Sequence, residues 1–190
     1  MRDYPILGGS VSQMQVQTYQ DHSTIWQNYP AAAWQWLPVL QGDTPSAYVA
    51  HAHMMQPLLA SMYNAYGELV IGVGSLVRKD MNIAERAGYT NLVLEALGKA
   101  LPGVRFFAFG LGVYVLNELE PHTKALLVGS DSSSWASSNN VQARQAHDNK
   151  RERARLGMTK WQYQFYIELP AYYAKVEWAL EKPRTSWMFA

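Results

Sequence analysis

The sequence contains no cysteine among its 190 residues. This absence excludes disulfide bonds, a thiolate nucleophile and every zinc site that needs a thiolate ligand. It also suits a reducing compartment, and we expect a cytoplasmic protein. Net charge is nearly absent as well, because 16 Lys and Arg residues face 15 Asp and Glu residues. A nucleic-acid partner would therefore have to be bound by a local basic patch.

Long apolar runs are missing too. No stretch is long and uncharged enough to span a membrane, and the first residues, MRDYPILGGS, lack the apolar segment of a signal peptide. We expect a soluble chain with no membrane partner. Its 48% hydrophobic content is enough for the core of one compact unit.

Four short apolar runs, each ending in glycine or a small polar residue, predict buried parallel strands. They cover residues 36–42, 68–74, 104–110 and 125–131. Helical patterns precede and separate them at 12–29, 45–66, 83–101 and, more weakly, 114–123. Two further helices are predicted at 141–156 and 159–180, the second interrupted by Pro170. This order predicts an α/β fold with right-handed crossovers and a parallel sheet.

Ligands of such sheets bind where the carboxyl ends of the strands emerge. The candidates are therefore Gln41 with Gly42, the segment 72–75, the segment 110–112 and the segment 130–132, all expected on one edge. Gln41 and Gly42 have a structural alternative, since Thr44 and Pro45 after them are typical of a helix start.

The segment GVGS at 72–75 predicts a glycine loop whose N–H groups approach a phosphate or a base carbonyl. It lacks the third glycine of a dinucleotide-binding pattern. Arg78 and Lys79 follow it, either as phosphate contacts or as a solvated edge. The basic segment 144–160, which begins at Arg144, is open to the same two interpretations.

No metal site is predicted. His51 and His53 are two residues apart on a predicted helix, so their side chains should point to different faces. Asp131 is the stronger candidate for chemistry, because a carboxylate at the end of a buried strand can act as base, nucleophile or recognition group. A helix cap is the competing interpretation of this residue.

Several segments occur together and in order: DYP at Asp3 to Pro5, PVLQG at Pro38 to Gly42, IGVGSLVRK at Ile71 to Lys79 and GSDSSSWAS at Gly129 to Ser137. In this respect the chain resembles the deazapurine DNA-modification transglycosylases, which are relatives of tRNA-guanine transglycosylase. The resemblance extends from Asp3 to about Arg155.

The resemblance implies a (β/α)8 TIM-type barrel enzyme that exchanges guanine in DNA for a 7-deazaguanine base, such as a preQ0-type precursor, without a cofactor. Asp131 matches the nucleophile that attacks C1′ of the sugar. Asp3 matches the residue that holds the Watson–Crick edge of the purine.

Other matched positions have supporting roles. The resemblance assigns base binding to Gln41, Gly42, Gly72, Val73, Gly74 and Ser75. It assigns contacts with the nucleic-acid backbone to Arg78, Lys79 and Arg144.

Four strands cannot close an eight-stranded barrel. We therefore expect the C-terminal half of a barrel over residues 1–158 and a helical extension over 159–190. An open half-barrel would expose two strand edges, so a second polypeptide or self-association is expected. The alternatives are a truncated product, a tRNA-guanine transglycosylase-like enzyme acting on RNA, or a noncatalytic subunit that binds a base or nucleic acid.

Overall fold

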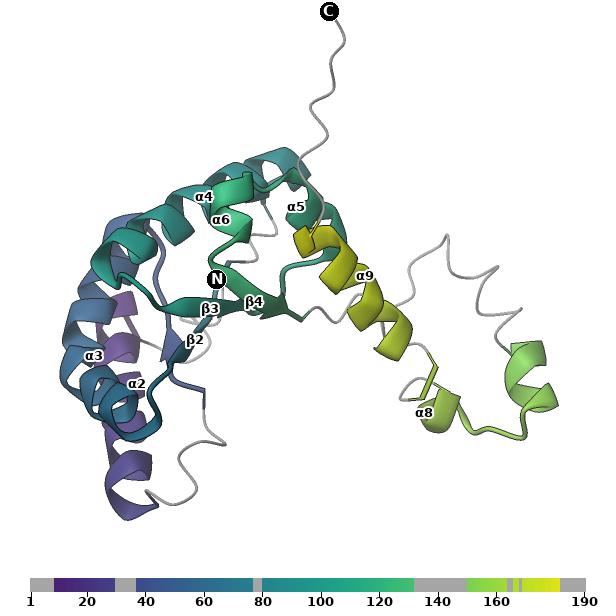
Figure 1. The fold of residues 1–190 in the computed structure, drawn as a ribbon, viewed down its shortest axis with the longest axis horizontal. Helices are drawn as coiled ribbons and strands as arrows, with labels where there is room; N and C mark the ends of the chain where they lie inside the picture. Colours follow the sequence, from purple (N-terminus) through teal and green to yellow (C-terminus); the bar gives the residue numbers. More distant parts are fainter. Residues whose placement is uncertain are drawn as a thin grey trace, which may run out of the picture.

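A computed structural model describes residues 9–29, 37–76, 80–131, 150–163, 166–167 and 169–181. Four strands in this part of the chain form one parallel sheet in the order β1-β2-β3-β4 (Figure 1). They are β1 (Val39–Leu40), β2 (Val70–Val73), β3 (Arg105–Ala108) and β4 (Leu127–Ser130). The prediction of an α/β fold with parallel strands is confirmed, and each strand is shorter than its predicted range. The partial barrel stays a prediction.

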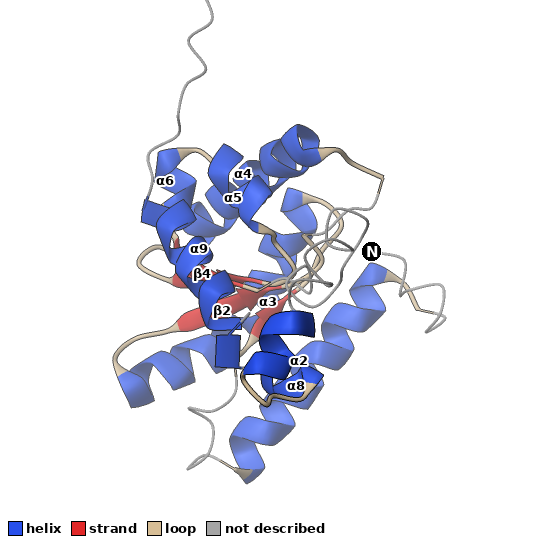
Figure 2. Cartoon of the chain, turned by 90° about the vertical axis from the view of Figure 1, so that its right-hand side faces the viewer, coloured by secondary structure: helices blue, strands red, loops and turns tan. Residues whose placement is uncertain are grey.

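Each crossover leads to the adjacent strand in the same direction. Helix α3 (Pro45–Tyr66) joins β1 to β2, and α4 (Ile83–Ala100) joins β2 to β3. Because crossovers between parallel strands are right-handed, repeated steps in one direction place the connecting helices on one face. Figure 1 shows α3, α4 and α5 as an arc along one side of the sheet. Figure 2 shows the strands grouped at the centre of the molecule with helices around them.

The long helices begin where the sequence offers caps. The Thr44 hydroxyl accepts a hydrogen bond from the N–H of Ala47, and Pro45 occupies the first turn of α3. Helix α3 ends at Gly67, which has a φ of 77°. Asn82 and Glu85 form a reciprocal capping box at the start of α4. Local sequence signals therefore set these boundaries.

Two of the predicted helices are each divided into two shorter ones. The helix expected at 114–123 is two short helices, α5 (Val113–Glu118) and α6 (Pro121–Lys124). Pro121 keeps Glu120 extended and so breaks the helical path. The last predicted helix is also two, α8 (Lys160–Tyr163) and α9 (Leu169–Glu181), and Pro170 lies in the first turn of α9, where it is tolerated. Residues 150–155 are helical, and 141–149 lie outside the described residues.

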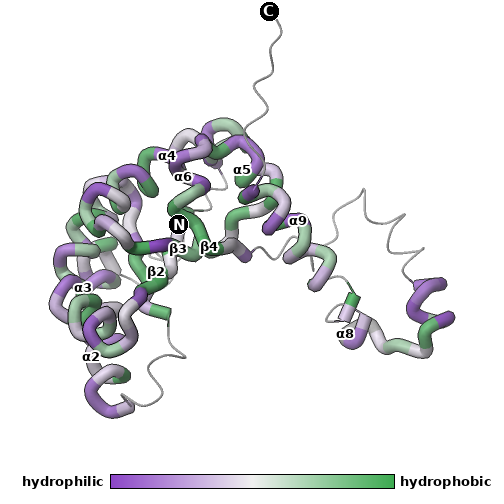
Figure 3. Tube along the Cα trace, in the orientation of Figure 1, coloured by the Kyte–Doolittle hydropathy of each residue, from purple (hydrophilic) through white to green (hydrophobic). Residues whose placement is uncertain are grey.

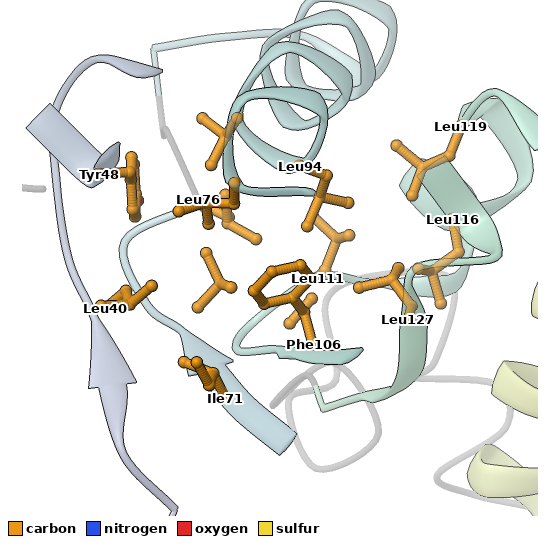
Figure 4. Packing of buried hydrophobic residues seen from close by; sticks show 14 of the residues in the cluster. Leu40, Tyr48, Ile71, Leu76, Leu94, Phe106, Leu111, Leu116, Leu119 and Leu127 are labelled. Carbon is orange, nitrogen blue, oxygen red and sulfur yellow. The ribbon is translucent and has the colours of Figure 1, made fainter. Parts of the chain in front are cut away.

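The hydrophobic core lies between the sheet and the helices. Figure 4 shows Leu40, Ile71 and Phe106 of the strands pointing toward Tyr48 and Leu94 of the helices. The strands are among the more hydrophobic parts of the trace in Figure 3, as expected for buried parallel strands. Helix α9 packs against β4 and α5 and adds Tyr172, Val176 and Ala179 to the same core.

The other face of the sheet alternates large and small residues. Val39, Gly72, Phe107 and Gly129 are register partners in one row across the four strands. A Cβ on Gly129 would meet the Phe107 ring at 3.1 Å, and a Cβ on Gly72 would meet the Phe109 ring at 2.5 Å. The two rings form an edge-to-face pair with centroids 5.3 Å apart. Glycine at these two positions therefore makes room for the aromatic rings.

Helix α2 (Val11–Asn28) covers the outer edge of β1. The Val39 N–H donates to His22 Nε2 of α2, and the Gln41 carbonyl accepts from Gln15 Nε2 of α2. The Gln41 N–H donates to His51 of α3. These contacts pair the polar groups that an edge strand otherwise exposes. The expectation of two open strand edges is therefore wrong at β1.

Two leucines of α4 provide a matched test of the core. Leu94 is 0% exposed and Leu92 is 58% exposed. We expect Leu94→Ala to lower the free energy of unfolding by about 3–4 kcal/mol, because it removes buried methyl groups and leaves a cavity. Leu92→Ala should change it by less than ~0.5 kcal/mol. Urea unfolding followed by circular dichroism measures both, and equal losses would contradict the described packing.

Candidate functional site at the carboxyl edge of the sheet

The four strand ends line one edge of the sheet, as predicted. Gln41, Gly74, Phe109 and Asp131 are the first residues after β1, β2, β3 and β4, respectively. Since the strands are parallel and adjacent in chain order, these residues follow one another along the edge. Neighbouring strands are about 4.8 Å apart, so the ends of β1 and β4 are roughly 14 Å apart. This edge can therefore contact a ligand of nucleoside size at several points.

Asp131 joins the end of β4 to the turn after β3. Its Oδ1 accepts a hydrogen bond of 2.6 Å from the N–H of Gly110, whose φ is 75°. Its own N–H donates to the carbonyl of Ala108 at 3.3 Å. The residue is half-buried, and no described residue forms a hydrogen bond with Oδ2. One carboxylate oxygen is thus anchored, and in the part of the chain that the structure describes the other is left for a ligand.

A helix cap was the competing interpretation of Asp131. The hydrogen bond that the structure shows is to the N–H of a turn glycine, not to the first turn of a helix. Residues 132–149, where a helix capped by Asp131 would begin, lie outside the described part of the chain. Beside Asp131, the buried Ser130 hydroxyl lies 2.7 Å from the carbonyl oxygens of Ala108 and Leu111. These contacts fix the backbone on which Asp131 sits.

Gln41 has a fixed backbone, and its side chain differs from it. Its N–H donates to His51 Nδ1 at 3.0 Å, and its carbonyl accepts from Gln15 Nε2 at 2.7 Å. Within the described residues, its side-chain amide makes no hydrogen bond, and its Cγ lies beside Gly74. An amide both donates and accepts, so it can pair with the edge of a base.

Gly42 has a structural explanation that needs no ligand. A Cβ at this position would lie 2.8 Å from the backbone nitrogen of Tyr48 and 2.7 Å from its ring. The first turn of α3 therefore packs directly on Gly42. This contact favours the structural interpretation of that glycine.

The glycine loop predicted at 72–75 is mostly strand. Gly72 and Val73 belong to β2, and the Val73 side chain is 0% exposed. The N–H groups of Gly72 and Gly74 donate to Pro38 and Leu40 of the β1 segment at 2.8 and 2.9 Å. These two N–H groups are therefore not available to a phosphate or a base, and the predicted loop is wrong for them.

Ser75 is the residue of this segment that stays a candidate. It is half-buried and has a φ of 63°, in the left-handed region that few residues other than glycine adopt. The carbonyl of Gly74 before it accepts a hydrogen bond from the buried Tyr48 hydroxyl. Such backbone strain is often found at binding sites.

The remaining predicted contacts fall outside the described residues. They are Asp3, Arg78, Lys79 and Arg144. Of the basic segment, residues 150–155 form an exposed helical turn, in which Glu152 accepts from the Tyr163 hydroxyl at 2.8 Å.

Sequence reasoning missed the side chains that support Gln41. His51 is 0% exposed whereas His53 is exposed, so the prediction that they occupy different faces is confirmed. Burial lowers the pKa of His51 and of His22 below the ordinary value. The spacing of Gln15, Tyr19, His22 and Trp26 on one helical face is the signal that would have identified this contact. Among the described residues, no three His, Cys, Asp or Glu side chains gather closely enough to hold a metal ion.

No family model, curated protein or solved structure matches this chain. None of the described helices is long and apolar enough to cross a membrane. A function for the candidate site is therefore inferred from the geometry of the site.

Alanine substitutions at Gly42 and at Gly88 test the structural role of Gly42. We expect Gly42→Ala to lower the free energy of unfolding by about 1–3 kcal/mol, because the added Cβ meets the backbone of Tyr48. Gly88→Ala in α4 should raise it by about 0.5–1 kcal/mol, since a Cβ there meets nothing within 4 Å and alanine favours the helix. Chemical denaturation measures both variants. A neutral Gly42→Ala would contradict this packing.

Asp131 variants separate its structural role from a functional one. Asp131→Ala removes the acceptor of the Gly110 N–H and should cost about 1–2 kcal/mol of unfolding free energy. Asp131→Asn keeps an oxygen at the Oδ1 position and should cost less than ~1 kcal/mol. Thermal and urea unfolding measure the two. If both variants cost the same, the hydrogen bond to Gly110 does not account for the structural role.

Proposed function

We propose that the carboxyl edge of the sheet binds guanine in DNA and that the protein is a guanine transglycosylase that inserts a 7-deazaguanine base. The observation that carries this proposal is the state of Asp131. One carboxylate oxygen is oriented by Gly110, and the other has no hydrogen-bond partner among the described residues. Asp131 shares the carboxyl edge with Gln41, whose side-chain amide has no hydrogen-bond partner among the described residues. The ordered segments that resemble deazapurine transglycosylases include both residues.

The proposed chemistry needs one free carboxylate oxygen. Asp131 Oδ2 forms a bond to C1′ of the sugar, and the bond from C1′ to N9 of guanine breaks, so the electron pair leaves with guanine, which takes up a proton. The incoming 7-deazaguanine then loses a proton, attacks C1′ and releases the carboxylate. The hydrogen bond from Gly110 orients Asp131 for both steps.

The rest of the edge suits recognition of a purine. Guanine presents one carbonyl acceptor and neighbouring N–H donors, and the Gln41 amide can pair with either kind of group. Ser75 lies between Gln41 and Asp131 in strand order, with a backbone that departs from the strand path. We assign Gln41 and Ser75 to base binding, and leave Gly42, Gly72, Val73 and Gly74 to the fold.

A half-barrel is part of this proposal. Four parallel strands in chain order, with their crossover helices on one face, are the arrangement that a segment of a (β/α)8 barrel has. A second polypeptide that completed the barrel at β1 would have to displace α2, because α2 and α3 already pair the outer edge of β1.

A noncatalytic base-binding subunit is the second candidate. The specific observation in its favour is that Asp131 Oδ1 already serves the fold as the acceptor for Gly110. A chain that kept this edge of the sheet for binding alone would show the same contact.

Exchange of labelled guanine in DNA tests the proposal, with formation of a covalent protein–DNA adduct on a denaturing gel as the second measurement. We expect Asp131→Asn to lower both by roughly 10³-fold or more while DNA binding is kept. Asp43→Asn is the matched control, because Asp43 is an exposed aspartate at the start of α3. An RNA substrate is tested in parallel.

The outcomes distinguish the candidates. Exchange with RNA alone would replace the DNA substrate by RNA. Binding of DNA or of a 7-deazaguanine base without exchange or adduct would overturn the transglycosylase and support the binding subunit. Absence of both binding and exchange would overturn both candidates.

A further inference from the structure

Helix α2 is held against the sheet by side chains that pair with the outer edge of β1. Gln15 and His22 are seven residues apart and so lie on one face of α2. Gln15 Nε2 donates to the Gln41 carbonyl at 2.7 Å, and His22 Nε2 lies 3.4 Å from the Val39 nitrogen. His51 Nδ1 of α3 lies 3.0 Å from the Gln41 nitrogen. Two histidines therefore accept hydrogen bonds from this edge.

Both histidines must be neutral to make these contacts. An imidazole nitrogen can accept a hydrogen bond from a backbone N–H only when that nitrogen carries no proton. His51 then carries its proton on Nε2, which is buried and has no hydrogen-bond partner among the described residues. A second proton would turn Nδ1 into a donor facing the Gln41 N–H, so the hydrogen bond from that N–H would be lost. The charge would then lie in a buried position, with the Gln41 carbonyl, 3.3 Å from Nδ1, as the acceptor near it.

Few charged groups near the two rings oppose the preference of both histidines for the neutral form. On α2 the other charged side chain is Asp21, which favours protonation of His22 and is itself bound by Gln17. On α3 the other titratable groups are the exposed His53 and the tyrosines. Asp43 before α3 is exposed. The charge of either ring also disfavours the charge of the other.

We propose that this contact is an acid-sensitive latch, in which protonation of His22 and His51 releases α2 and exposes the outer edge of β1. The direction follows from burial, which lowers the pKa of each histidine in the folded chain below its ordinary value of 6.5. The stability that the two neutral histidines contribute to the folded chain is complete above pH ~6.5 and is lost as the pH falls below that value.

Release has two consequences. The free edge of β1 becomes able to pair with a strand of another chain. The backbone of Gln41 also loses two of its supports, so the carboxyl edge of the sheet changes with it. The latch does not depend on the proposed transglycosylase activity, because its evidence is the contact between α2, α3 and β1.

Amide hydrogen exchange, measured by NMR, tests the latch. We expect the protection factors of the Val39 and Gln41 amides, corrected for the intrinsic effect of pH, to fall at least about 10-fold between about pH 7.5 and pH 5.5. A variant with both His22→Gln and His51→Asn places an amide oxygen near each acceptor nitrogen but cannot be protonated. Its protection factors should not change with pH. His122→Gln, at an exposed histidine, should behave as wild type.

Three results would overturn the proposal. The first is unchanged protection of both amides at the lower pH, as would follow if protonated His51 donated to the Gln41 carbonyl, 3.3 Å away. The second is the same acid-induced loss in the double variant. Should that variant fail to fold, NMR titration of the two imidazole rings in the wild type replaces it. The third result that would overturn the proposal is protonation of both rings without loss of amide protection.

Discussion

The constraint on which this structure depends is the parallel pairing of four strands in chain order. Parallel neighbours need long crossovers, and right-handed crossovers that always step in one direction place the helices on a single face. That face is where Leu40, Ile71 and Phe106 are buried against α3 and α4. The same geometry brings all carboxyl ends to one edge. The core and the candidate site therefore follow from one arrangement.

An edge strand leaves alternate N–H and C=O groups without partners, and here helices satisfy them at β1. This requirement explains why the inner face of α2 carries Gln15 and His22 beside aromatic residues, whereas a helix packed on a sheet face would be apolar. It also explains why the backbone and the side chain of Gln41 differ. Its backbone is fixed by two polar contacts, and its side-chain amide has no hydrogen-bond partner in the described part of the chain.

Asp131 combines a structural contact at one oxygen with a second oxygen that no described residue binds. The hydrogen bond to Gly110 joins the ends of two neighbouring strands, as a purely structural aspartate would. Yet the same bond orients the carboxylate along the edge where ligands of α/β proteins bind. The proposed transglycosylase reaction is one chemistry for that oxygen. Gly42 and Gly72 belong instead to packing, since Tyr48 and Phe109 occupy the space that a side chain would need.

Sequence alone determined what depends on neighbours along the chain. Short apolar runs predicted the strands, and Thr44, Pro45, Gly67 and Asn82 set helix ends through local hydrogen bonds and backbone preferences. Pairing across the chain was decided by tertiary structure. Strand pairing gave the N–H groups of Gly72 and Gly74 partners in the β1 segment, and the approach of α2 and α3 to β1 turned His22 and His51 into acceptors for its edge. Periodicity shows which residues share a face of a helix, but which polar groups that face meets depends on how the helices pack.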